Sequence, residues 1–186
     1  MGFPGVWGLC TLFVLLPGTL SQDCQRLQLQ QVLNRDALKI LTDMGGSFPL
    51  QCVATRESLQ VDPLDLHQLV NRSQAQEKIQ IVHQTLRHIS KIYSRSLGSV
   101  TWSREKVENF RLLLERQLRE LETCVRKPGA ESRQRRNSAI LKYFKKLNKF
   151  LKQKKFSDCS WEIIRTETRA RLQQLLFITG QLNKSN

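Results

Sequence analysis

The chain has 186 residues, a formal net charge of +14 at pH 7 and 40% hydrophobic residues. This length favours a single domain, and the hydrophobic share excludes a disordered chain because it is large enough to build a core. The positive charge bears on partners and solubility and says nothing about the fold.

The first 21 residues have the form of a secretory signal peptide. Their apolar run, residues 6–16, is too short to span a bilayer, and the small residues Thr19 and Ser21 precede an expected cut at Gln22. A buried N-terminal helix is the alternative, which the prolines and glycines of this stretch oppose. No other segment is apolar enough to cross a membrane. We therefore expect a secreted, extracellular protein with a signal peptide at 1–21 and one helical domain at 22–186.

Cleavage of the signal peptide would leave four of the five cysteines. These are Cys24, Cys52, Cys124 and Cys159. An even number of cysteines in a secreted chain indicates two disulfide bonds. No pair has CxxC spacing, and the three histidines form no metal-binding pattern with them, so we expect no metal ion and no other cofactor. Glycosylation sequons begin at Asn71 and Asn183, as is common in secreted proteins.

Apolar residues recur at helical spacing along most of the chain. The first predicted helix covers residues 25–44 and ends at Gly45-Gly46. A connection of nearly thirty residues follows, in which Asp62-Pro63 can start a short helical turn. A capping box from Ser73 to Gln76 predicts the start of the second helix, which ends at residues 97–99.

Three more helices are predicted after residue 99. The third starts near Ser103 and ends before Pro128-Gly129, the fourth covers residues 138–155, and the fifth follows Asp158, a candidate N-cap. The apolar residues expected to face inward from the fourth helix are Ile140, Leu141, Phe144, Leu147 and Leu151. Those of the fifth are Trp161, Ile164, Thr168, Leu172, Leu175 and Thr179. No segment alternates with period two, so the expected fold class is all-α.

The connection lengths restrict the topology. Each helix from the third to the fifth should run antiparallel to the one before it, because the connections between these helices are short or moderate. The first helix can point either way. If it is parallel to the second, Cys24 lies near Cys124 and Cys52 near Cys159; if it is antiparallel, the pairs are Cys24–Cys159 and Cys52–Cys124. A Cys24–Cys52 bridge would join the ends of a helix roughly 30 Å long, whereas bridged Cα atoms lie within about 7 Å. Two pairings remain.

The stretch from Leu141 to Leu172, LKYFKKLNKFLKQKKFSDCSWEIIRTETRARL, resembles the same region of type I interferons. Its most specific part runs from Lys154 to Arg165: basic residues, an aromatic residue, Ser, Cys, a small residue, Trp, Glu, two β-branched residues and Arg. Phe48-Pro49 shortly before Cys52, and Trp102 at the start of the third helix, also stand in the family's order. The resemblance covers essentially all of the mature chain.

This resemblance implies an up-up-down-down helical cytokine bundle. The bundle has five helices, and a long overhand connection follows the first helix. The first two helices run parallel. The implied disulfides are Cys24–Cys124 and Cys52–Cys159. The implied function is that of a monomeric secreted cytokine. It would bridge the two chains of the type I interferon receptor, a class II cytokine receptor, and trigger JAK-STAT antiviral signalling.

By the same resemblance, residues of the long connection and the fifth helix would engage the high-affinity receptor chain. These are Val53, Arg56, Arg165, Thr166, Arg169 and Gln173. Together with Glu162, the fifth-helix members have a spacing that predicts one exposed helix face. An ordinary solvated face is the alternative interpretation. The positions matching the surface for the second receptor chain are Lys106, Arg111 and Glu115.

A second hypothesis is that the protein binds polyanions. From Arg126 to Lys155 there are twelve lysines or arginines and one acid, Glu131. The lysines that largely line one side of the fourth helix are Lys142, Lys145, Lys146, Lys149 and Lys152. They could bind heparan sulfate or an anionic membrane surface, and the alternative is a solvated helix face. Secretion favours heparan sulfate, so we expect no nucleic-acid partner and no stable membrane insertion.

Two further expectations concern cleavage and catalysis. Residues 133–136, RQRR, have the form of a proprotein-convertase site that we expect to stay uncut in most molecules. The chain has no GxSxG, no HExxH and no phosphate-binding glycine loop, which predicts that it is not an enzyme and has no catalytic residues.

Overall fold

The computed structural model describes residues 27–95, 97, 100–125 and 137–184. Their helical elements are α1 (Leu27–Gly45), η2 (Leu50–Cys52), α2 (Val53–Glu57), α3 (Leu66–Val70), α4 (Ala75–Tyr93), α5 (Arg104–Val125), α6 (Ser138–Gln153) and α7 (Asp158–Lys184). No strand occurs among the described residues. The predicted all-α class is therefore confirmed.

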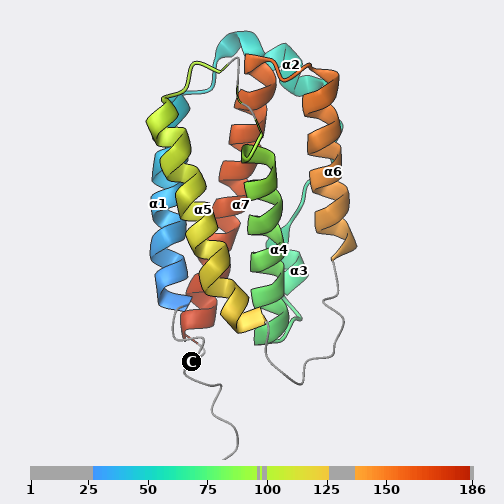
Figure 1. Ribbon diagram of the computed structural model, residues 1–186. Coiled ribbons are helices and arrows are strands. Elements are labelled where there is room, and N and C mark those ends of the chain that lie inside the picture. The colour runs from blue at the N-terminus through green and yellow to red at the C-terminus, as the bar shows by residue number, and fades with distance from the viewer. Residues whose placement is uncertain (1–26, 96, 98–99, 126–136, 185–186) are drawn as a thin grey trace, which may run out of the picture.

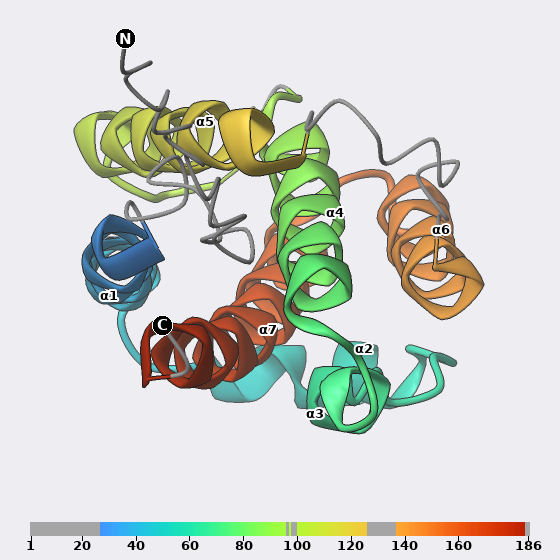
Figure 2. The same cartoon turned by 90° about the horizontal axis from the view of Figure 1, so that it is seen from below.

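The long helices form an up-up-down-down bundle (Figure 1). Helices α1 and α4 run upward in this view, α5 and α7 run downward, and α6 runs upward at one side. Helix α1 packs against α5 and α7, whereas α4 packs against α5, α6 and α7. Viewed from below, α4 and α7 separate α6 from α1 and α5 (Figure 2). The parallel arrangement of the first two long helices confirms the topology that the resemblance implied.

The core forms where the apolar faces of the long helices meet. Trp161 of α7 is fully buried, and its ring contacts Tyr93, Trp102 and Phe156. The apolar residues predicted to face inward from α6 are buried, with one exception: Leu141 is 44% exposed. That prediction was wrong because Ile140, Phe144, Leu147 and Leu151 fall on one stripe of the helix at about 100° per residue, whereas Leu141 lies to one side of that stripe.

Several helix ends differ from the sequence-based expectations. The prediction of a capping box at Ser73 is wrong. Helix α4 begins after Gln74, whose side chain makes no capping hydrogen bond. The Ser73 hydroxyl instead donates to the carbonyl of Leu69, four residues earlier in the chain. Such local bonding by serine competes with its use as a cap. Asp158 lies in the first turn of α7 rather than at its N-cap.

The short helix α3 begins at Leu66, three residues after Pro63. Its N-cap is Asp65, whose carboxylate accepts hydrogen bonds from the backbone N–H groups of His67 and Gln68. An acidic oxygen at this position satisfies donors that have no partner within the helix.

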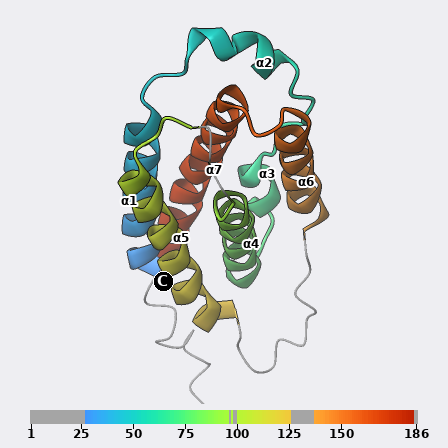
Figure 3. The same cartoon turned by 45° about the horizontal axis from the view of Figure 1, so that its top comes forward.

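The connection between α1 and α4 passes over the top of the bundle through η2 and α2, then descends through α3 (Figure 3). A disulfide between Cys52 and Cys159, with Cα atoms 5.0 Å apart, fastens it to the first turn of α7. This bridge confirms one of the implied pairs. Cys124 is buried, whereas Cys24 lies outside the described residues, so the second pair stays a prediction.

Two other predictions also fall outside the described residues. These are the signal peptide at 1–21 and the convertase motif at 133–136. Among the helices that the structure describes, none is both long and apolar enough to cross a membrane.

Candidate functional site

A buried charge network lies where the upper ends of α1, α5 and α7 meet. The Arg165 guanidinium contacts the Glu162 carboxylate one turn earlier in α7, with Nη2 and Nε at 2.7 and 3.0 Å from Oε2. The indole N–H of Trp102 donates to the other carboxylate oxygen of Glu162 at 2.5 Å. All three side chains are buried. The prediction that Glu162 and Arg165 lie on an exposed face of this helix is therefore wrong.

Arg165 also holds the end of α1. Its Nη1 donates to the carbonyl of Leu41 at 3.2 Å, and its Nη2 donates to the carbonyl of Gly46 at 2.9 Å. Gly46 directly follows α1, and a cation at the C-terminal end of a helix is favourable. A Cβ atom on Gly45 would lie 2.5 Å from the Arg165 Nε and 2.9 Å from the Trp102 Nε1. Glycine at position 45 therefore makes room for this network.

The other residues predicted for the high-affinity receptor chain lie nearer the surface. Val53 and Arg56 are exposed on α2, and Arg169 and Gln173 are exposed on α7. Thr166 is partly buried, with its hydroxyl donating to the Glu162 carbonyl. Helix α2 contacts α7, so the two segments lie side by side.

Arg56 is held close to its own connection. Its guanidinium carbon lies 5.6 Å from the centre of the Phe48 ring, within the range of a cation–π contact. Phe48 in turn packs against the hydrophobic core. This contact links an exposed charge to the interior.

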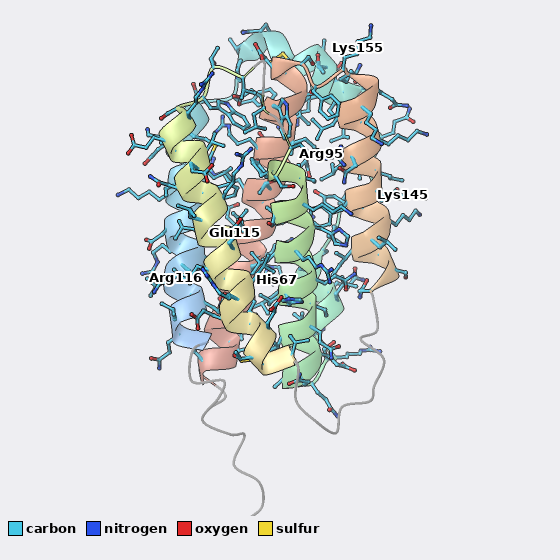
Figure 4. The ribbon with its side chains drawn as sticks, in the orientation of Figure 1. His67, Arg95, Glu115, Arg116, Lys145 and Lys155 are labelled. Carbon is cyan, nitrogen blue, oxygen red and sulfur yellow. A yellow bond between two sulfur atoms is a disulfide. The ribbon has the colours of Figure 1, made fainter. Side chains whose placement is uncertain are left out.

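The three residues predicted for the second receptor chain have different environments. Glu115 is exposed on α5 (Figure 4), and Lys106 is exposed with its ammonium group donating to the carbonyl of Asp43. Arg111 is partly buried and donates to the carbonyls of Tyr93 and Arg95 at 2.7 and 2.9 Å. Arg111 thus caps the end of α4, which is a structural use that sequence spacing did not reveal.

The lysines of α6 divide into two groups. Lys146 and Lys142 lie 2.8 and 3.6 Å from the Asp62 carboxylate, and the hydrogen bond from Lys146 is the main cause that lowers the pKa of Asp62 below its usual value. The others are exposed, and the described residues offer them no ion pair. They are Lys145, Lys149 and Lys152. Lys145 points away from the bundle in Figure 4.

A second polar cluster joins α6 to α7 and was missed from the sequence. The Tyr143 hydroxyl donates to a Glu167 carboxylate oxygen at 2.6 Å, and the guanidinium of Arg171 lies over the Tyr143 ring. Arg171 also donates to the carbonyl of Leu64. Burial, followed by the nearby Glu167 charge, raises the pKa of Tyr143. Tyr143 and Glu167 are far apart in sequence, so no local pattern pointed to this contact.

The two sequons also differ. Asn71 is exposed at the end of α3. Asn183 is partly buried near the end of α7, and its amide donates to the side-chain oxygen of Gln31 in α1. A glycan at Asn183 would have to disrupt this contact, whereas one at Asn71 would extend from the surface.

Comparison with known proteins identifies the family. Residues 27–182 match the interferon alpha/beta domain. The chain is 30% identical over 151 residues to interferon a3 of Oncorhynchus mykiss, which covers 81% of each chain. It is 30% identical over 154 residues to interferon alpha-7 of Homo sapiens, which covers 79% of each.

Solved structures show the same similarity. Zebrafish interferon 1 superimposes with a TM-score of 0.70 at 26% identity, covering 86% of this chain and 99% of its own. Zebrafish interferon 2 has the same fold, with a TM-score of 0.60 at 23% identity. The chain therefore belongs to the interferon alpha/beta family of type I interferons, which are secreted cytokines and not enzymes.

Proposed function

We propose that this protein bridges the two chains of the type I interferon receptor and thereby starts JAK-STAT antiviral signalling. The observation that carries the proposal is the family match across residues 27–182. Bridging needs no catalysis. Once one receptor chain holds the cytokine at the membrane, the second chain meets it at a raised effective concentration.

The surface proposed for the high-affinity receptor chain combines α2 and α7. Its exposed or partly exposed residues are Val53, Arg56, Thr166, Arg169 and Gln173. The Cys52–Cys159 bridge supports this assignment because it restrains α2 beside α7 before a partner arrives. A surface that is ordered in advance loses less entropy on binding. The arginines would also speed association with an acidic receptor surface.

Arg165 has an indirect part in this proposal. Its guanidinium is engaged by Glu162 and by the carbonyls of Leu41 and Gly46. Arg165 would therefore position the end of α1 and the start of the connection that leads to Arg56. Direct receptor contacts are assigned to the exposed residues.

The surface proposed for the second receptor chain lies on α4 and α5. Lys106 and Glu115 are exposed there, which is compatible with direct contacts. Arg111 would contribute mainly by holding the end of α4 against α5, because its donors bind the carbonyls of Tyr93 and Arg95.

The test measures the affinity for each receptor ectodomain separately, together with antiviral signalling. We expect Arg56→Ala and Arg169→Ala each to weaken binding to the high-affinity chain by at least about tenfold, since interface arginines are often hot spots. Glu115→Ala should weaken binding only to the other chain. Arg87→Ala, which removes an exposed arginine of α4, is the control for the high-affinity chain.

Circular dichroism must show that each variant stays helical. If a folded wild-type protein neither binds the two ectodomains nor signals, the proposed function is wrong. If it signals while Arg56→Ala and Arg169→Ala retain full affinity for both chains, the assigned surface is wrong and the function stands.

We also propose that the signal peptide is cleaved before Gln22. Of the two sequons, Asn71 should be glycosylated in preference to Asn183. The difference in exposure and the Asn183–Gln31 contact support this order. The intact mass and N-terminal sequence of protein secreted by eukaryotic cells would test both parts. A glycan found only on Asn183, or a mature chain that starts elsewhere, would contradict them.

A further inference from the structure

Helix α6 presents a lysine-rich face that the receptor proposal does not use. The helix packs on α4 and α7 through one side only. The residues buried on that side are Ile140, Tyr143, Phe144, Leu147, Phe150 and Leu151. Both phenylalanines and the tyrosine of α6 thus face inward, and its exposed lysines lie on the outer side.

The charge of this face is barely balanced by acids. No aspartate or glutamate occurs from residue 132 to residue 157. Within the described part of the chain, Asp62 is the acid in ion-pair contact with the α6 lysines, and it engages Lys146 and Lys142. Lys145, Lys149 and Lys152 are exposed, and no described residue forms an ion pair with them.

We propose that the outer face of α6, centred on Lys145, Lys149 and Lys152, binds sulfated glycosaminoglycan chains. The helical rise sets Lys142 and Lys152 about 15 Å apart along the axis, so the ammonium groups form a row that a linear polyanion can follow. Lysine ammonium groups act as compact point charges and suit sulfates that repeat along a polymer. Interferons are secreted, so the polyanions they meet include those of the cell surface and matrix.

The buried aromatic side chains argue against two other anionic partners. A helix that binds in a membrane interface inserts large apolar side chains, and α6 exposes only Leu141 among its large hydrophobic residues. Proteins that bind single-stranded nucleic acid stack bases on exposed aromatic rings, and Tyr143, Phe144 and Phe150 are buried. The outer face of α6 can therefore recognise an anionic partner mainly through the charge of its lysines.

The outer face of α6 lies away from the α5 residues proposed for the second receptor chain. Helices α4 and α7 separate α6 from α1 and α5 (Figure 2), and Lys145 points outward from the bundle (Figure 4). A polysaccharide bound along α6 would therefore lie away from Lys106 and Glu115, the exposed α5 residues proposed for the second receptor chain. The inference does not depend on receptor binding, and its test contains no receptor.

The main experiment measures binding to a heparin oligosaccharide at physiological salt. We expect the triple variant Lys145→Ala/Lys149→Ala/Lys152→Ala to lose about a hundredfold in affinity, since each basic residue near an anionic surface contributes roughly fivefold. The matched control, Arg35→Ala/Arg116→Ala/Arg119→Ala, removes the same charge from exposed positions on α1 and α5. It should retain most of the affinity.

A second variant should increase binding. Asp62→Asn would release Lys146 and Lys142 to the ligand, so we expect a severalfold gain in affinity. Asp36→Asn makes the same charge change at an exposed position on α1 and should have a smaller effect. Circular dichroism and thermal unfolding check that each variant is folded.

Several results would overturn the inference. One is no heparin binding by the wild type at physiological salt. Another is an equal loss in the two triple variants, which would mean that net charge alone drives binding. A third is binding to phosphatidylserine–phosphatidylcholine vesicles without binding to heparin, which would favour a membrane surface. Heparin binding that is lost in the α6 triple variant and retained in its control would support the inference.

Discussion

Two ion pairs with nearly equal distances have opposite environments. Arg165 and Glu162 approach to 2.7 Å with side chains 6% and 10% exposed, whereas Lys146 and Asp62 approach to 2.8 Å with side chains 35% and 76% exposed. The first pair lies beneath the end of α1, and the second lies at the surface beside α6. Distance alone therefore does not reveal what a charged pair contributes.

Solvent explains the difference. Removing charges from water is unfavourable unless every group finds a partner. The buried pair meets this condition through Trp102 and through the carbonyls of Leu41 and Gly46. The exposed pair can exchange its partners for water, and salt screens it. The buried pair therefore contributes to architecture, whereas the exposed pair sets the charge available on the α6 face.

The largest effect is expected from Arg165→Ala. It leaves the Glu162 carboxylate buried without its cation and should lower the free energy of unfolding by about 3–5 kcal/mol. Chemical denaturation followed by circular dichroism measures this change. The double variant Glu162→Leu/Arg165→Met should be less destabilised, because no charge is left unpaired. A loss below about 1 kcal/mol for Arg165→Ala would show that water reaches this site. The Arg165–Glu162 pair would then behave like the exposed Lys146–Asp62 pair.

Gly45→Ala tests the same network through steric crowding. Its Cβ would overlap the Arg165 side chain and the Trp102 indole, so we expect a loss of about 1–3 kcal/mol, typical of overpacking. Gly180→Ala in α7 is the control, because the new Cβ would meet only the end of the Gln31 side chain, at 3.2 and 3.9 Å. Greater helix propensity should make that variant neutral or more stable. Equal thermal midpoints for the two variants would refute the crowding argument.

Tyr143→Phe examines a contact of intermediate exposure. Loss of the Tyr143–Glu167 hydrogen bond should lower the free energy of unfolding by about 1 kcal/mol, because the partly exposed Glu167 can be hydrated again. The pKa of Tyr143 is raised in the folded protein, so its stabilising effect is present below the unfolded value of about 10 and is lost as pH rises above it. The variant should lose less stability between neutral and alkaline pH than the wild type. An unchanged alkaline profile would contradict this assignment.

Lys146→Ala should have the smallest effect on stability. We expect no measurable change in the thermal midpoint, because exposed ion pairs contribute little. The pKa of Asp62 should rise towards its usual value, since Lys146 is the main cause of its lowering. A carboxyl titration followed by NMR measures this. A clear drop in the thermal midpoint of Lys146→Ala would mean that the exposed Lys146–Asp62 pair also stabilises the fold, as the buried Arg165–Glu162 pair does.

Much of the fold could be predicted from the sequence because helical periodicity is a local property. The spacing of apolar residues located every long helix to within a few residues, and it identified Trp161 as a core residue. The short helices η2 and α2 were missed, since three and five residues are too few to show a period. The capping box failed because Ser73 bonds backwards to Leu69 instead of forwards.

The candidate site was less predictable. Arg56 and Arg165 looked equivalent by resemblance, yet one is exposed and the other buried. Lys106 and Arg111 likewise looked like one surface, although Arg111 binds carbonyls at the end of α4. Long polar side chains have the same spacing whether they point to solvent or to a neighbouring helix, so the pattern does not distinguish these cases.

The sequence by itself determined the helical class, the order of the long helices and the family. The helices follow from the local spacing of apolar residues, and the family follows from a short specific motif. Geometry left two disulfide pairings, and the resemblance chose between them. Only the tertiary structure decided which charges are internal. Helix α7 packs against α1, α4 and α6, and its upper end lies beneath α2 and η2, so residues that would face water on an outer helix are buried there. Burial depends on what surrounds a helix, and contacts between residues such as Arg165 and Leu41 exist only after the chain has folded.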